Sequence, residues 1–254
     1  MNLRASYRYQ LADHKKSILV FYLVIFCIYL LTAIAVIAIS HYEKGQISGS
    51  MSGVESAALI FLFVSGMNSF KENFGMLTQN GVSRRSLLVG RIFVMATVCL
   101  FMALVDKVWY FITIWMSGIF KNINDTSMFM DMLYNRSAVL SPFGLHMESL
   151  VFNFASYFMA MCLGYLITVI FYRMSKLGKL IAGVGVPVLF LIVLPIIDTL
   201  LFKGLIHYHV SNFLVRVLGL HVGNPMYAVG SFFVVSAITL AASWFVMRRA
   251  PLHE

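Results

Sequence analysis

Six long apolar runs constrain what this chain can fold into more than any other feature of its sequence. A bilayer core of about 30 Å needs about 20 helical residues to cross it. Three runs contain no charged residue. The weakest, Val54–Phe70, is near the lower length limit, and its polar residues indicate contact with protein rather than lipid. The runs cover residues 17–40, 54–70, 92–120, 149–172, 180–202 and 227–247. The sequence therefore predicts an all-α integral membrane protein with six transmembrane helices in one domain, residues 1–254.

The composition excludes several other classes of protein. Of the 254 residues, 60% are hydrophobic and 11% are charged, whereas a soluble domain carries about 25% charged residues. A chain this apolar cannot cover a water-facing surface, and it is neither a disordered chain nor a collagen-like fibre. Its three cysteines lie inside apolar runs without CxxC or zinc-ligand spacing, so a disulfide-stapled domain is excluded as well.

The distribution of basic residues predicts the orientation. If both termini are cytoplasmic, thirteen of the 19 Lys and Arg residues fall in cytoplasmic segments, five fall outside, and Lys107 lies in a span. This asymmetry follows the positive-inside rule and is lost if Val54–Phe70 does not cross. The net charge of +9 is therefore explained by membrane topology rather than by binding to nucleic acid.

The first 16 residues form a mildly amphipathic segment. Leu3, Tyr7 and Leu11 recur every four residues, with Arg4 and Arg8 grouped beside them. Such a pattern fits a short interfacial helix before the first span. A simple basic flank that orients the first span is an equally good interpretation.

Residues 71–91 form the largest predicted cytoplasmic loop. Asn80-Gly81 is a turn signal, and Ser83 suits the N-cap of a helix that begins at Arg84. Three apolar residues before the turn, Phe74, Met76 and Leu77, need a surface to cover them. Either the membrane interface or a soluble partner would serve.

The external segment Lys203–Pro225 is too apolar for a simple solvated loop. Gly219, Gly223 and Pro225 interrupt it. We expect a re-entrant hairpin between the fifth and sixth spans, packed against protein that satisfies its backbone polar groups. Three of its apolar residues are candidates for an extracellular gate: Val210, Phe213 and Val217.

Five charged residues are predicted to share the outer zone of the membrane. Asp106 and Lys107 lie in the third span and Asp198 in the fifth, while Glu55 and Glu148 open the second and fourth spans. One interpretation is a packing pair, in which Lys107 meets Asp106 or Asp198. The other is a polar vestibule through which cargo leaves.

No motif for chemistry on this chain is visible. The sequence contains neither GxxxxGK[ST] nor HExxH, and none of its seven histidines lies in the middle of an apolar run. We therefore expect no catalytic residue, no metal site and no cofactor in this chain. Its function should be binding, transport or assembly rather than catalysis.

Together these features resemble the membrane subunit of a type-2 ATP-binding cassette (ABC) exporter. The shared features are an amphipathic start, six spans with both ends inside, a partly apolar outer hairpin, and the string Phe-x3-Phe-Gly-x5-Gly-x-Ser-Arg-Arg from Phe70 to Arg85. The resemblance covers nearly the whole chain but is architectural, and only the Gly81-x-Ser83-Arg84 region matches a local pattern of the family.

The resemblance implies how such a chain works. The loop after the second span would dock on a separate ATPase subunit that binds ATP and Mg²⁺, two ATPases would serve two permeases, and the second permease would be an identical copy. The matching coupling residues are Lys71, Glu72, Phe74, Met76, Leu77 and Gln79. The cargo would be an amphipathic peptide, a lipid or a drug-like molecule, moved across a bacterial plasma membrane in peptide export or antimicrobial resistance.

Two alternatives stay open from the sequence. One is a secondary transporter that needs no ATP. The other is a membrane signalling or assembly protein without cargo.

Overall fold

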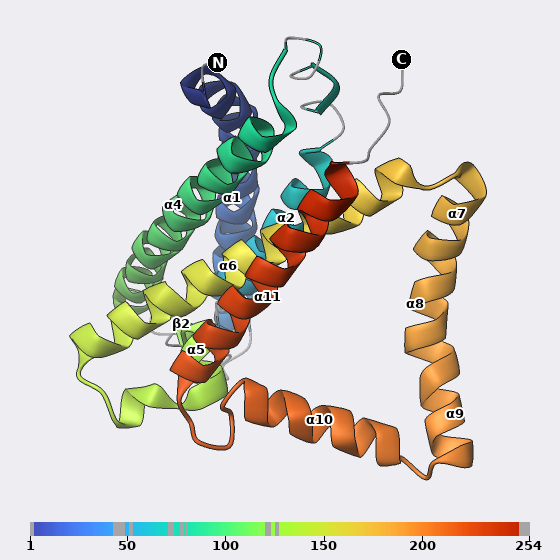
Figure 1. Cartoon of the computed structure of the whole chain (residues 1–254). Helices are drawn as coiled ribbons and strands as arrows, with labels where there is room; N and C mark the ends of the chain where they lie inside the picture. The colour runs from blue at the N-terminus through green and yellow to red at the C-terminus, as the bar shows by residue number, and fades with distance from the viewer. Residues whose placement is uncertain are drawn as a thin grey trace.

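The computed structural model describes residues 3–42, 49–50, 53–70, 74–76, 79, 81–119, 123–124 and 127–248. Nearly all of these residues are helical (Figure 1). The described strands are β1 (Gly49–Ser50) and β2 (Ile123–Asn124), which pair in parallel over two residues each. The expected all-α fold is therefore confirmed.

Five helical stretches are long and apolar enough to cross a membrane, as in a multi-pass membrane protein. They are Ser6–Val36, Arg84–Ser117, Pro142–Arg173, Lys176–Leu201 and Pro225–Met247. The remaining apolar run forms α2 (Val54–Asn68), which has only 15 residues, or about 22 Å at a rise of about 1.5 Å per residue. That α2 completes a sixth crossing stays a prediction.

The central helix of the bundle is α6 (Pro142–Arg173), which begins after a Ser141 side chain that accepts from the Gly144 N–H. α2, α4 (Arg84–Ile119) and α11 (Pro225–Met247) pack on α6, and α1 (Leu3–Tyr42) packs on α4. The contact of α2 with α6 is very close, because a Cβ atom at Gly66 or Gly164 would overlap a backbone carbonyl of the other helix. Small residues permit this approach of two membrane helices.

We call the two ends of the bundle the amino end, where α1 begins, and the far end. At the amino end lie the start of α1, the end of α2, the start of α4 and the ends of α6 and α11 (Figure 1). The Arg84 side chain joins two of these helices by donating to the carbonyls of Met247, at 3.3 Å, and Arg248, at 2.6 Å. At the far end lie α5 (Phe129–Tyr134), the start of α6 and the start of α11.

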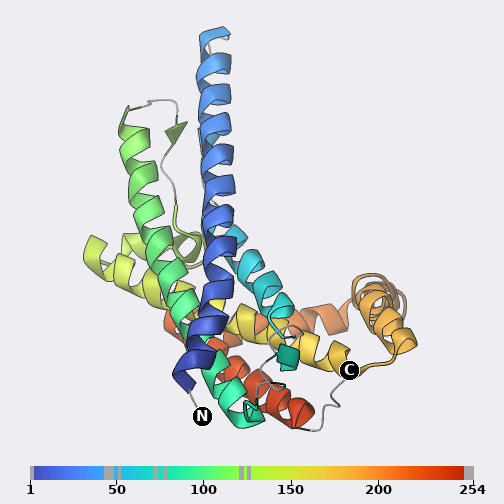
Figure 2. The same ribbon diagram turned by 90° about the horizontal axis from the view of Figure 1, so that it is seen from above.

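The amphipathic N-terminal segment is not a separate helix, so the interpretation as a short interfacial helix was wrong. Residues from Leu3 onward are continuous with the first apolar run in α1, a helix of 40 residues. Neither glycine nor proline interrupts this stretch, so nothing in the backbone forces a break. The second half of α1 stands clear of α6 and α11 (Figure 2).

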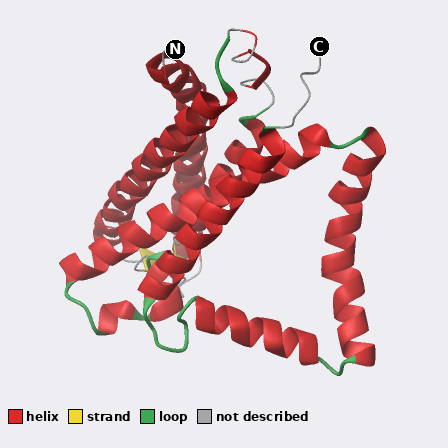
Figure 3. Ribbon diagram, in the orientation of Figure 1, coloured by secondary structure: helices red, strands yellow, loops and turns green. Residues whose placement is uncertain are grey.

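A second part of the chain, residues 176–217, leaves the bundle, and we call it the arm. It runs through α7 (Lys176–Leu180), α8 (Val186–Val188) and α9 (Leu194–Leu201), and then turns into α10 (Leu205–Val217). π-Helical turns at η2 (Ile181–Gly185) and η3 (Leu189–Val193) precede Pro187 and Pro195, because each proline removes a backbone hydrogen bond. Figure 1 shows the arm away from α6, joined to the bundle by short loops at its two ends (Figure 3).

Asp198 is the one buried residue of the arm, every residue of which is described. Its carboxylate accepts from the backbone N–H groups of Ile206 and His207, both at 2.9 Å. It thereby caps the amino terminus of α10. The sharp corner before α10 uses Lys203 and Gly204, with φ of 51° and 82°.

Candidate functional site

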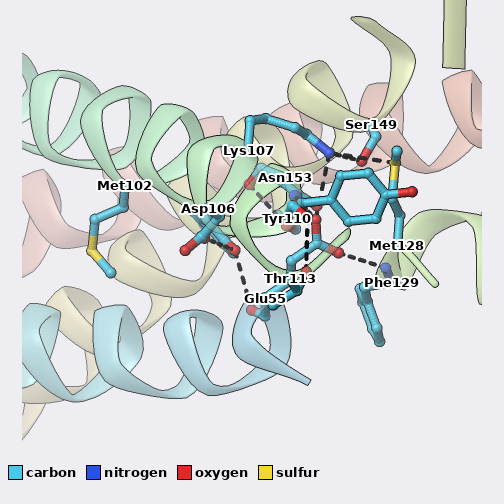
Figure 4. Close-up of polar contacts among 12 residues, drawn as sticks. Glu55, Met102, Asp106, Lys107, Tyr110, Thr113, Met128, Phe129, Ser149 and Asn153 are labelled. Atoms are coloured by element: carbon cyan, nitrogen blue, oxygen red, sulfur yellow. Dashed lines mark hydrogen bonds and ion pairs between the residues drawn. The ribbon is translucent and has the colours of Figure 1, made fainter. Parts of the chain in front are cut away.

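The main polar cluster of the bundle lies toward the far end, between α2, α4 and α6 (Figure 4). α4 supplies Asp106 and Lys107, and the first turn of α2 supplies Glu55. Asp106 and Lys107 are 2% and 7% exposed. Charged groups this deeply buried must be paired or hydrogen-bonded to be tolerated.

Lys107 pairs with Glu55. The Lys107 Nζ lies 3.5 Å from Glu55 Oε1, donates to Ser149 Oγ at 2.5 Å, and lies 3.6 Å from Met128 Sδ. Our expectation that the partner is Asp106 or Asp198 was therefore wrong. Successive residues of a helix point about 100° apart, so Asp106 cannot share the direction of Lys107, and Asp198 lies in the arm.

Both carboxylate oxygens of Glu55 accept a hydrogen bond. Oε1 accepts from the side-chain amide of Asn153 at 2.6 Å, and Oε2 accepts from the backbone N–H of Phe129 at 2.5 Å. Glu55 thus ties α2 to α6 and to the start of α5. Because its partners, Lys107 included, come from three different segments, Glu55 fixes the arrangement of the far end.

Asp106 is held by two tyrosines rather than by a cation. The hydroxyl of Tyr22 in α1 donates to Oδ1 at 2.9 Å, and the hydroxyl of Tyr157 in α6 donates to Oδ2 at 2.5 Å. The Tyr157 hydroxyl also lies 3.2 Å from the backbone oxygen of Glu55. Asp106 therefore links α1, α4 and α6 at the level of the Lys107 pair.

The other two predicted outer charges have partners elsewhere. Glu148 accepts two hydrogen bonds from Arg136, both at 3.0 Å, and this pairing raises the pKa of the Arg136 guanidinium above its usual value. Asp198 caps α10. The structure thus brings together Glu55, Asp106 and Lys107 but not all five charges, and the geometry is that of a packing cluster more than of an open vestibule.

Sequence reasoning missed a second buried network, at the amino end. Arg91 is 1% exposed, and its Nη1 lies 2.9 Å from His14 Nε2, while His14 Nδ1 lies 3.0 Å from Ser65 Oγ. The guanidinium also lies over the ring of Tyr165, at 5.8 Å from its centroid. Arg91 looked like a basic flank of the third span because its partner is 77 positions away, and no local pattern joins the two.

The predicted coupling segment is partly described. Lys71, Glu72 and Leu77 lie outside the described residues, while residues 74–76 are helical. Phe74 is fully buried: its ring stacks on Phe70, with centroids 4.9 Å apart, and meets Tyr172 at 5.7 Å. Our expectation that Phe74 needs a partner surface was therefore wrong, since the bundle itself covers it.

Two other coupling residues face outward. Met76 is 49% exposed, with the Tyr9 hydroxyl 3.0 Å from its sulfur, and Gln79 is exposed. The segment is thus tied to α1 through Met76 and to α2 and α6 through Phe74.

The predicted gate residues do not form a buried plug. Val210 and Phe213 of α10 are 51% and 65% exposed, and Val217 is intermediate. No residue of α10, a fully described helix, is buried. The expected packing against protein is therefore absent along α10, a single 13-residue helix. It is present in the turn before α11, where Leu218 and Leu220 pack against the cluster that contains Tyr134.

The described residues contain no group of three or more His, Cys, Asp or Glu side chains placed to hold a metal ion. Cys99 and Cys162 are buried, at 3.9 Å from the sulfurs of Met161 and Met95 respectively.

Comparison with known proteins leaves the family open. No protein-family model matches the chain, and neither a curated protein nor a solved structure matches it.

Proposed function

We propose that this chain is the permease subunit of an ATP-driven ABC exporter in a bacterial plasma membrane, acting as two copies with two separate ATPase subunits. ATP and Mg²⁺ bind to the ATPases. The permease forms the path for an amphipathic peptide, lipid or drug-like cargo. The amino end of the bundle is the cytoplasmic end, as the positive-inside count favours.

One observation carries the proposal: the short helical segment 74–76 is anchored in the bundle on one side and exposed on the other. Phe74 is fully buried against Phe70 and Tyr172, whereas Met76 is half-exposed. A push on the exposed side reaches α2 and α6 through a packed ring stack. Such contacts are rigid enough to pass on a displacement, since protein interiors are close-packed.

Phe74 therefore has a different role from the one first expected. It transmits movement into the bundle, and the contact with the ATPase falls to Met76, Gln79 and their neighbours in the loop. The Tyr9 contact with Met76 brings α1 into the same coupling. α1, α2 and α6 would then shift together when the ATPases close.

The test separates the docking surface from the fold. Met76→Glu places in the proposed interface a charge whose desolvation is costly. The ATPase subunit should therefore no longer copurify with the tagged chain from its own host. Bound chains are identified by mass spectrometry, and ATP hydrolysis of the complex is measured. The matched control is Met132→Glu, an equivalent change at a 62% exposed methionine of α5, which should leave the complex intact.

Two results would count against the proposal. If no chain with a P-loop copurifies with the native protein, a transporter that needs no ATP or an assembly protein is favoured. If Met76→Glu and Met132→Glu retain the same ATPase, segment 74–79 is not the docking surface.

A further inference from the structure

A cavity of about 460 Å³ opens at the amino end of the bundle, between α1, α2 and α6. Seven of its ten lining residues are polar, although it lies among helices of a membrane protein. The polar side chains include Asp13, Ser17, Ser65, Asn68 and Thr168, and the apolar wall is Phe61, Val64 and Met67. Polar groups among membrane helices are costly unless a polar partner or water meets them.

The network behind the cavity fixes the role of Ser65. A guanidinium has only donors, so Arg91 donates to His14 Nε2 at 2.9 Å. The hydrogen of the neutral imidazole then lies on Nδ1 and is donated to Ser65 Oγ at 3.0 Å. The Ser65 hydroxyl accepts from His14, and its own hydrogen is left to donate into the cavity.

Thr168 and Asp13 present acceptors to the cavity. Thr168 commits its hydroxyl hydrogen to the Met67 carbonyl at 2.6 Å, which leaves its lone pairs for the cavity. Asp13, an exposed residue at the opening, carries the one negative charge of the lining and has no hydrogen-bond or ion-pair partner among the described residues. The site is therefore rich in acceptors and carries a negative charge at its mouth.

The buried cation stands behind the lining of the cavity rather than in it. Arg91 does not line the cavity, because the His14 ring stands between the guanidinium and Ser65. Its Nε and Nη2 have no hydrogen-bond partner among the described residues, and the guanidinium lies over the face of the Tyr165 ring. Asp13 thus remains the charged group that a ligand in the cavity meets directly.

We propose that this cavity binds the protonated amino group of an amphipathic ligand, whose apolar part lies along Phe61, Val64 and Met67. A primary ammonium has three N–H donors, which matches Asp13 and the lone pairs of Ser17 and Thr168. A volume of about 460 Å³ falls within the usual range of small-molecule sites, about 300–1,000 Å³. The proposal that the cavity binds such a ligand depends only on the cavity. That this ligand is the transported cargo rests on the proposed function.

The test uses the full chain in lipid nanodiscs without any ATPase. Octylammonium is titrated by calorimetry, with empty nanodiscs as the blank for partition into lipid. Octyltrimethylammonium has the same charge and chain but no N–H donor, so it should bind about tenfold more weakly, as the loss of a charge-assisted hydrogen bond predicts. Asp13→Asn should weaken octylammonium binding by about tenfold for the same reason.

Asp131→Asn is the matched control. Asp131 lies in α5 at the far end, and it accepts from the Ser137 N–H at 2.7 Å. The amide oxygen that this substitution introduces can still accept from the same N–H, so the variant should bind octylammonium as the native chain does. Equal affinity for the two ammonium ions, equal effects of Asp13→Asn and Asp131→Asn, or a preference for octanoate or octyl glucoside would each overturn the proposal.

The result is independent of the permease assignment. Because no ATPase is present, a failure to bind leaves the exporter proposal standing. Binding without copurification of an ATPase would keep the site but remove its role in ATP-driven export.

Discussion

The bundle and the arm differ in how they pack although both are strongly apolar. The stretch Lys176–Leu201 is more hydrophobic than Pro142–Arg173, yet α6 buries twelve residues and the arm buries only Asp198. Lipid is as apolar as leucine, so hydrophobicity does not drive membrane helices together. What α6 has, and residues 180–197 lack, is a set of polar contact residues and glycines against which another helix packs. The arm also has small residues, Gly183 and Gly185, but no backbone of another helix approaches them.

Two of these residues illustrate the difference. Gly164 lets the α2 backbone approach closely, and Asn153 donates to Glu55. From Leu180 to Ile197 the arm carries no polar side chain. Apolar length therefore places a helix in the membrane, and small or polar residues decide which helix it meets.

The strongest test of this comparison is the buried ion pair. Lys107→Met leaves Glu55 without its cation and should lower the free energy of unfolding by about 3–5 kcal/mol. The double variant Glu55→Gln with Lys107→Met should recover part of that loss, because glutamine still accepts from Asn153. Unfolding in mixed detergent micelles measures both, and a double variant as unstable as the sum of the single ones would exclude the pairing.

The next largest effect is expected at a glycine of the bundle, Gly164, with two other glycines as controls. Gly164→Ala forces a Cβ atom onto the Phe63 carbonyl, so the free energy of unfolding should fall by about 3 kcal/mol, the upper end for overpacking. In the arm, a Cβ atom at Gly183 would meet only the Phe171 ring edge at 3.9 Å, and Gly183→Ala should be neutral. Gly230→Ala in α11, with nothing within 4 Å, should be neutral too. Equal losses at Gly164 and Gly230 would show that the α2–α6 contact is not close.

The same leucine substitution in the two regions sharpens the contrast. Leu62 in α2 is fully buried, and Leu191 in the arm is 77% exposed. In lipid the loss comes from the cavity rather than from transfer, so Leu62→Ala should cost about 2 kcal/mol. Leu191→Ala should stay within about 0.5 kcal/mol. A large loss at Leu191 would mean that the arm packs against protein, and a concentration-dependent loss would identify a second copy.

The smallest expected effect lies at the corner of the arm. Asp198→Ala removes the acceptor for the N–H groups of Ile206 and His207 and should cost about 1 kcal/mol, as for other helix caps. Asp198→Asn keeps an acceptor oxygen and should lose less. Faster hydrogen exchange confined to the first turn of α10 is the expected readout, and exchange that also rises in α6 would contradict the separation of arm and bundle.

The sequence by itself determined the parts that depend on local properties. The length and polarity of each run fix which stretches are helices able to cross a bilayer, and the polar residues of the second run correctly predicted that α2 contacts protein. A rise of about 1.5 Å per residue also placed Asp106 toward the far end of α4. These features need only the residues of one helix and the thickness of the membrane.

Only the tertiary structure decided which residues meet. Depth along a helix follows from counting residues, but the rotation of each helix and the choice of its neighbour depend on packing with segments far away in the chain. Lys107 therefore meets Glu55, 52 positions earlier, rather than the carboxylates at a similar depth. Phe74 turns into the ring stack of the bundle, and Arg91 meets His14 across α1 and α4. The sequence of one helix alone does not identify the residue that it meets on another helix, because the contact free energy exists only once both helices are in place.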